Sequence, residues 1–308
     1  MEPCKERTDV SGSGLDRLQT EQANPRTCDL DLLPTEEMLR VINAEDRRVA
    51  EAVAEVIPAI ARAVERIADA VRAGGRLHYF GAGTSGRLAV LDASECPPTF
   101  GVPAEMVQGH IAGGPPALVR SAEGAEDDEA SGARDAAGAG IGASDAVVAI
   151  AASGRTPYCI GALREARRRQ AFTAALVCNR PTPMHELADV IIDPVVGPEV
   201  LSGSTRMKSG TAQKLVLNMI STGLMVRLGR THGNLMVAVR ATNEKLRARA
   251  ARLVAQVTGR TEGVEEALLA CGWDVRTACL MLIKDIPAAD AHRLLEEASG
   301  SLRAALEG

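Results

Sequence analysis

The chain has 308 residues, 46% of them apolar, which is enough for one large domain and a small one, or for two domains. Its net charge of −5 and its aromatic content of 2% argue against a basic, base-stacking surface for nucleic acid. No apolar run approaches the roughly 20 residues that a membrane span needs, and the first residues are polar. We therefore expect a protein that binds neither nucleic acid nor membranes.

The cysteines and histidines indicate neither a disulfide framework nor a metal site. Seven cysteines are scattered along the chain with no C-x-x-C pair, which is typical of reduced thiols in the cytoplasm. The five histidines form no H-x-x-x-H motif, and none pairs with a cysteine at zinc spacing. We predict a cytoplasmic protein without a bound metal or cofactor.

The N-terminal part divides into an extension and a helical segment. Residues 1–19 are polar and contain glycine and serine, so we expect a disordered extension. Residues 20–75 contain a helix that begins with a capping Thr35 and repeats apolar residues at three- and four-residue spacing. Pro58 predicts a kink or a break, and Gly74-Gly75 ends the helix.

Residues 76–230 alternate short β-rich runs with helical patterns. Strands are predicted at 76–80, 145–152, 172–178 and 188–193, and helices at 158–170 and 204–229. This alternation predicts an α/β fold in three layers, α/β/α, with a parallel sheet covered by helices on both faces. The run GVPAEMVQG at 101–109 lacks the pattern of a buried strand.

The C-terminal part is predicted to be entirely helical. Residues 231–260 contain a helix at 241–259, and we expect this connection to contribute to the functional site. Residues 261–308 have the pattern of a small bundle of three short helices.

The motif GAGTSG at 81–86 fits the dinucleotide fingerprint G-x-G-x-x-G, which by itself is a weak signal. About 75 mostly helical residues precede it, whereas a dinucleotide-binding fold has the motif in its first βαβ unit. Glu105 lies near the offset of the acid that binds the ribose, but no convincing strand leads to it. The chain also lacks a P-loop motif. Nucleotide binding is therefore disfavoured.

Three loops rich in glycine, serine and threonine each precede a predicted helix. They are GAGTSGR at 81–87, ASGRTPY at 152–158 and SGSTRMKSGT at 202–211. Hydroxyls and free N–H groups at helix N-termini bind phosphate, and such loops converge at the carboxyl edge of a parallel sheet. Each loop alone fits an ordinary helix cap or turn, but the three together favour a phosphorylated small molecule.

Two stretches carry carboxylates that could act as acid or base. LDASECPP at 91–98 places Glu95 at the end of a predicted helix, before a Pro-Pro stop. SAEGAEDDEA at 121–130 contains Glu126 among other acidic residues. By spacing alone, a helix end and a solvated acidic surface explain both.

Longer words in the chain resemble the N-acetylmuramic acid 6-phosphate etherase family. They include GAGTSGRLAVLDASECPPTFG, EGAEDD, IAASGRTPY, GSTRMKSGTAQKLVLNMISTGLM and ATNEKL. The resemblance runs from about residue 20 to the C-terminus and implies a sugar isomerase (SIS) fold. It also implies an enzyme that removes D-lactate from N-acetylmuramic acid 6-phosphate, giving N-acetylglucosamine 6-phosphate during cell-wall sugar recycling.

The resemblance implies roles for particular residues. Glu95 matches the proton donor of the family, and Glu126 matches its second catalytic residue, the C2 base or the activator of water. An acid that acts near neutral pH needs shielding from water, which burial beside Pro97 and Pro98 would supply. The residues implied for binding are Thr84 and Ser85 for the sugar, Ser153, Arg155 and Thr156 for the phosphate with Ser202, Ser204 and Thr205 nearby, and Lys245. Lys245 is equally explained as a solvated helix lysine, and could act in the neighbouring subunit.

The resemblance further implies a homodimer with its site near the subunit interface, and no metal or redox cofactor. The C-terminal helices are similar to small ubiquitin-associated bundles. Two other functions fit the same fold: a sugar-phosphate isomerase, and a non-catalytic sugar-phosphate sensor such as the glucokinase regulatory protein. The isomerase does not require both glutamates, and the sensor expects a much longer chain.

Overall fold

The computed structural model describes residues 18–239, 241 and 243–308. The predicted extension at 1–19 lies outside these residues, apart from Leu18 and Gln19. The chain forms two compact units. The first contains the described residues up to Ala93 together with Met106–Ile220, and the second contains Ser94–Glu105 and Ser221–Gly308.

The first unit is built on a parallel sheet of five strands in the order β2-β1-β3-β4-β5. The strands are β1 (Leu77–Gly81), β2 (Val107–Ile111), β3 (Ala146–Ile150), β4 (Phe172–Leu176) and β5 (Val190–Ile192). In register, Leu77 of β1 pairs with Val107 of β2 on one side and with Ala146 of β3 on the other. The four strands predicted from β-rich runs are confirmed, and so is the parallel sheet.

Strand β2 was not predicted, because its segment lacks the pattern of a buried strand. Its sequence VQGHI is only partly apolar because β2 is an edge strand whose middle residues are half-buried. A Cβ at Gly109 would lie 2.7 Å from Val90 Cα, so the glycine lets helix α3 lie directly on the strand. Glu105 precedes β2 instead of ending it, which removes the acid that a dinucleotide site requires.

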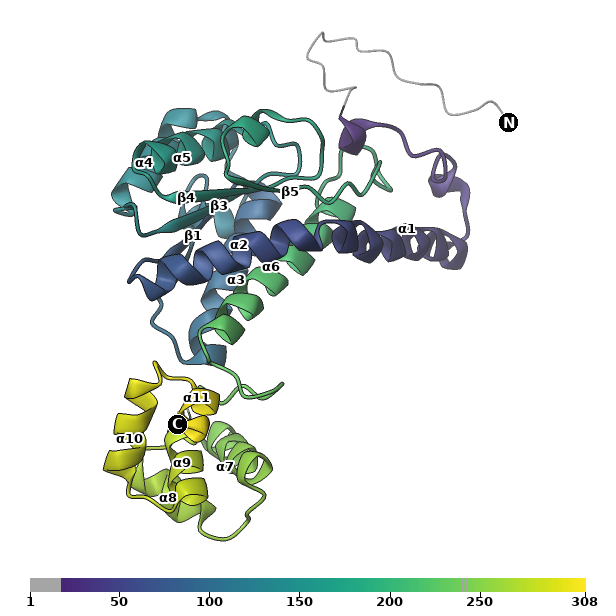
Figure 1. The fold of residues 1–308 in the computed structure, drawn as a ribbon. Coiled ribbons are helices and arrows are strands. Elements are labelled where there is room, and N and C mark those ends of the chain that lie inside the picture. Colours follow the sequence, from purple (N-terminus) through teal and green to yellow (C-terminus); the bar gives the residue numbers. More distant parts are fainter. Residues whose placement is uncertain (1–17, 240, 242) are drawn as a thin grey trace. The chain divides into compact units, whose positions relative to one another are not determined.

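Helices cover both faces of the sheet, as the three-layer α/β/α prediction states (Figure 1). The α-helices up to residue 227 are α1 (Thr35–Glu55), which extends beyond the sheet, α2 (Ile57–Arg72), α3 (Gly83–Phe100), α4 (Glu129–Gly138), α5 (Pro157–Arg168) and α6 (Lys208–Arg227). Phe80 of β1 faces Tyr158 of α5. On the opposite face, the Tyr79 hydroxyl donates to Asp92 of α3, which also pairs with Lys214 of α6. Helices α3 and α6 begin in the first unit and end in the second.

The N-terminal helical segment has a break where Pro58 predicts a kink or a break. Helix α1 ends at Glu55, and Pro58 is the second residue of α2, where a missing N–H costs no hydrogen bond. Gly74 adopts a left-handed conformation just after α2, as expected of a helix stop. The predicted cap is wrong, because Thr35 is the first residue of α1 and Pro34 occupies the cap position without a side-chain hydrogen bond.

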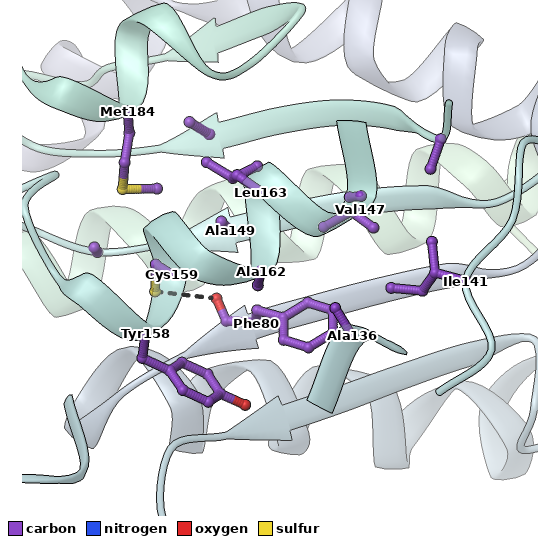
Figure 2. Packing of buried hydrophobic residues seen from close by; sticks show 14 of the residues in the cluster. Phe80, Ala136, Ile141, Val147, Ala149, Tyr158, Cys159, Ala162, Leu163 and Met184 are labelled. Carbon is purple, nitrogen blue, oxygen red and sulfur yellow. Dashed lines mark hydrogen bonds between the residues drawn. The ribbon is translucent and has the colours of Figure 1, made fainter. Parts of the chain in front are cut away.

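The core under α4 and α5 is closely packed (Figure 2). Phe80, Val147 and Leu163 are fully buried there, and the Cys159 thiol donates to the Phe80 carbonyl. Helices α4 and α5 approach through glycines: a Cβ at Gly132 would lie 1.9 Å from the Tyr158 carbonyl oxygen. This contact holds α4, and with it the acidic segment that precedes α4, against the sheet.

Two histidines lie close together on β1 and β2, His78 fully buried and His110 half-buried. His78 Nδ1 lies 3.1 Å from His110 Nε2, and the His110 ring stacks on Phe80. Burial lowers the pKa of His78 to about 4, with further lowering from His110 and Arg76. Burial also lowers the pKa of His110. Both histidines are therefore neutral in the folded protein near pH 7.

Because His78 is buried, we expect the free energy of unfolding to fall in acid. Because the pKa of His78 is lower in the folded chain than its ordinary 6.5, the unfolded chain binds protons more strongly. Stability should therefore be complete above about pH 6.5 and fall by up to about 3 kcal/mol towards pH 4. Urea unfolding at a series of pH values measures this slope. His78→Gln should flatten it, and an unchanged slope in that variant contradicts the assignment.

The second unit has a helical core of its own. It comprises α7 (Glu244–Thr258), α8 (Val264–Ala270), α9 (Val275–Lys284), α10 (Ala288–Glu297) and α11 (Leu302–Glu307). Four helices therefore lie in 261–308, where the sequence predicts three, because a turn at Ser299 and Gly300 separates α11 from α10. Val237 and Val254 are buried in the same core as Leu280 of α9. Among the described residues, no helix is long and apolar enough to span a membrane.

Candidate active site

The loops of the first unit meet at the carboxyl edge of the sheet. Strand β1 lies between β2 and β3, so the chain moves outward in opposite directions from it, and such a switch point is where open α/β sheets bind ligands. The loops after β3 and β4 are joined, because the Cys178 N–H donates to the Ala152 carbonyl at 2.9 Å. Asn179 donates to the same carbonyl and to the Thr20 hydroxyl. Of the three predicted glycine-rich loops, the one after β3 is therefore held at this edge by the loop after β4.

The loop after β1 places Thr84 and Ser85 in the first turn of α3. Ser85 is buried, and its hydroxyl donates to Gln213 Oε1 of α6 at 2.9 Å. Thr84 is half-buried and lies against Gly210, also of α6. The first turns of α3 and α6 therefore lie side by side. Gln213 is a residue that the sequence analysis missed: its Nε2 is buried without a hydrogen-bond partner in the described chain.

The loop after β3 leads into α5 with Thr156 at the cap position. The Ser153 hydroxyl accepts a hydrogen bond from the Arg155 N–H at 3.2 Å. Gly154 is left-handed, and a Cβ there would lie 2.4 Å from the Thr182 hydroxyl oxygen. Ser153, Arg155 and Thr156 are all half-buried at the N-terminus of a helix, which is a favourable place for an anion.

The third glycine-rich loop, 202–211, does not offer a ligand the helix N-terminus that the sequence predicted there. Helix α6 begins at Lys208, so Ser204 and Thr205 precede it, and its first N–H groups are already bonded. The buried Glu199 carboxylate accepts the N–H of Lys208 at 2.8 Å and that of Ser209 at 2.9 Å. The N-terminus of α6 is therefore occupied by a carboxylate of the chain itself. The loop still offers hydroxyls to a ligand, those of exposed Ser202 and of half-buried Ser204 and Thr205.

A buried ion pair fixes this third loop. Lys208 is fully buried, and its ammonium lies 2.7 Å from Glu45 Oε2 of α1. Glu45 also accepts hydrogen bonds from Arg26 and Asn24. The Arg26 hydrogen bond, followed by those of Lys208 and Asn24, lowers the pKa of Glu45 to about 2. The N-terminal segment, α1 and α6 are thus joined behind the loop by one charged network.

Glu126 lines a cavity beside the end of β1. The cavity has a volume of about 290 Å³ and is lined by Ala82, Gly83, Arg87, Ala112, Ala117 and residues 121–126. Glu126 lies on a short 3-10 helix, Ala125–Asp127, with its side chain exposed. Arg87 of α3 donates to the carbonyls of Leu118 and Arg120, which holds the segment that leads to Glu126. The cavity therefore joins the GAGTSGR loop to one of the two predicted glutamates, and Arg87 is a further residue that the sequence analysis missed.

Glu95 and Lys245 belong to the second unit. Glu95 is exposed in the interior of α3, so the burial expected beside Pro97 and Pro98 is not found within this chain. The Pro-Pro pair does not stop the helix either, because the Gly101 N–H donates to the Pro97 carbonyl and the last turn continues. Lys245 is exposed in the first turn of α7. The roles implied for both residues stay predictions.

The class of protein follows from this fold and its loops. Residues 59–167 match the family model of the glucokinase regulatory protein N-terminal SIS domain, and residues 125–222 match that of the SIS domain. Among solved structures, a phosphoheptose isomerase from Neisseria gonorrhoeae is similar at 16% identity and a TM-score of 0.49, over 62% of this chain and 98% of that one. The sheet and its helices are those of an SIS domain.

Curated relatives narrow the class to one family. Proteins named N-acetylmuramic acid 6-phosphate etherase from Yersinia pestis and Yersinia pseudotuberculosis are 57% identical over 293 residues. The match covers 95% of this chain and 99% of each relative. The chain belongs to the N-acetylmuramic acid 6-phosphate etherase family.

Proposed function

We propose that the protein cleaves the D-lactyl ether of N-acetylmuramic acid 6-phosphate and releases N-acetylglucosamine 6-phosphate and D-lactate. The observation that carries this proposal is the 57% identity, over nearly the whole chain, to relatives that bear the name of this activity. The cavity that joins the GAGTSGR loop to Glu126 supports it.

The chemistry requires two acid/base groups. An ether oxygen is a poor leaving group, but in the ring-opened sugar the C1 aldehyde acidifies the C2 proton. A base removes that proton, the C3–O bond breaks, and an acid protonates the departing lactate oxygen. Water then adds at C3 of the unsaturated aldehyde, and C2 regains a proton. We assign the acid to Glu95 and the second role, C2 base or activator of water, to Glu126.

We propose that the phosphate binds at the N-terminus of α5. Ser153, Arg155 and Thr156 supply a hydroxyl, a guanidinium and a capping position there. Hydroxyls of Ser202, Ser204 and Thr205 add donors, whereas Glu199 already uses the first N–H groups of α6. Thr84 and Ser85 would contact the sugar, and Lys245 would contribute from the second unit or from a neighbouring subunit.

We also propose a cytoplasmic homodimer. Leu32 and Leu39, which precede and occupy α1, are more than half exposed, as side chains that pack in a subunit interface would be in a single chain. The cysteines of the described chain, four of them buried, suit a reducing compartment. Sedimentation equilibrium measures the oligomeric state.

A regulator that binds sugar phosphates without turnover is the second candidate, because residues 59–167 match the glucokinase regulatory protein. An assay for lactate distinguishes the two functions. Purified protein incubated with N-acetylmuramic acid 6-phosphate should release one D-lactate for each N-acetylglucosamine 6-phosphate formed. Fructose 6-phosphate, incubated in parallel, tests for isomerase activity. Absence of lactate, with either ester bound or isomerised instead, contradicts the proposal.

A further inference from the structure

The second unit contains a cavity that the proposed reaction does not use. Its volume is about 500 Å³, large enough for a small organic molecule. It is lined by Gly101, Ala238, Val239, Ala241, Arg247, Gly272, Trp273, Asp274 and Arg276. Trp273 is the single tryptophan of the protein.

Trp273 lines this cavity in a strained backbone conformation. Gly272 and Trp273 are both left-handed, a conformation that a bulky residue rarely adopts. The Trp273 N–H donates to the Leu268 carbonyl at 2.7 Å, which fixes the turn after α8. The Arg247 guanidinium lies over the indole ring, 5.1 Å from its centre. The cavity thus has an aromatic wall with a cation on it.

Positive charge at the cavity exceeds negative charge. Arg276 pairs with Asp274 at 2.9 Å and donates to the Gly300 carbonyl, and Arg230 lies beside it, close to Gly300. The Nε atoms of Arg230 and Arg276 are buried without a hydrogen-bond partner in the described chain. Counted over these described residues, the three guanidinium groups of Arg230, Arg247 and Arg276 at or beside the cavity exceed the carboxylate of Asp274 by two positive charges. An anion would stabilise guanidinium groups whose buried Nε atoms have no hydrogen-bond partner in the described chain.

We propose that this cavity binds a phosphate monoester. A phosphate monoester carries close to two negative charges at neutral pH, which matches the excess charge better than a single carboxylate does. Guanidinium groups present the fork of N–H donors that phosphate oxygens accept. The remaining volume, beside Ala238, Val239 and the Trp273 ring, accommodates the organic part of the ester.

The fluorescence of Trp273 provides a direct test, since no other tryptophan contributes to it. The full-length protein is titrated with inorganic phosphate and with glycerol 3-phosphate, each at constant ionic strength. We expect a saturable change with a Kd of about 1 mM or below, weaker binding of acetate, and no saturable change with chloride. No saturable change, or acetate binding as tightly as phosphate, would overturn the proposal.

Amino-acid substitutions test whether the change in fluorescence arises from binding in this cavity. Arg276→Met should raise the Kd at least about tenfold, since it removes a charge-assisted contact. Because that change also breaks the Asp274 pair, the exposed Arg247→Met serves as a second variant, with folding checked by circular dichroism. Arg155→Met, which alters the proposed phosphate site of the first unit, should leave the Kd unchanged. Loss of the response in Arg155→Met, with retention in both other variants, would overturn the proposal. These outcomes do not depend on the lactate assay.

Discussion

Replacing Glu95 with glutamine should lower kcat for D-lactate release by about 100- to 10,000-fold. Glutamine keeps the size and most hydrogen bonds of the side chain but cannot transfer a proton to the departing lactate oxygen. The charge of an exposed side chain on α3 contributes little to folding, so the variant should keep its fold. Binding of N-acetylglucosamine 6-phosphate should therefore change little. The measurement combines lactate release with the inhibition constant of the product.

Glu105 supplies the matched control for this variant. It is also an exposed glutamate of the second unit, and we assign it no role in the reaction. Glu105→Gln should therefore retain normal turnover. Normal turnover in Glu95→Gln would show that the proton donor is another residue, whereas equal loss in both variants would indicate a general effect of charge.

Removing the carboxylate of Glu45 should lower the free energy of unfolding by about 3–5 kcal/mol. Glu45→Ala leaves the fully buried Lys208 ammonium without its partner, and Arg26 and Asn24 also lose their acceptor. Because Lys208 begins α6, the loop with Ser202, Ser204 and Thr205 should loosen as well, and KM should rise. Urea unfolding measures the stability, and steady-state kinetics measures KM.

Two further variants test whether the loss of stability comes from the buried Glu45–Lys208 pair or from the loss of any carboxylate on α1. Glu36→Ala removes an exposed ion pair with Arg40 on the same helix and should cost less than about 1 kcal/mol. The double variant Glu45→Leu/Lys208→Met replaces both charges by apolar groups and should be more stable than Glu45→Ala. If Glu45→Ala costs no more than Glu36→Ala, the network does not hold the loop.

Local sequence was sufficient for most of the sheet. The runs that became β1, β3 and β4 are fully buried and mostly apolar, with His78 and Thr173 as polar exceptions, and glycines end the helices before β1 and β3. Edge strand β2 was not predictable in this way. Its Gln108, Gly109 and His110 fit there because β1 supplies the hydrogen bonds on one side and α3 covers the glycine.

The candidate site was likewise predictable only in part from local sequence. Glycine, serine and threonine at helix starts mark the loops, and the quoted words identify the family, so Glu126 and the GAGTSGR loop, which line one cavity, were selected as candidates without a structure. Gln213 and Arg87 were missed because each bonds a partner that is distant in sequence, and Glu199 was missed because no local pattern marks its contact with Lys208. A lone glutamate before a loop gives no sign that it caps a helix nine residues later.

The sequence by itself determined the α/β class and the family, because these reside in periodicity and in contiguous words. Only the tertiary structure decided that β2 is a strand and that α6 starts at Lys208. It alone placed the Glu45–Lys208 pair behind the loop, and it showed α3 continuing through Pro97 and Pro98. These features depend on contacts between segments that are distant in the sequence. The free energy of such contacts comes from burial and from the neutralisation of charge, which no local pattern encodes.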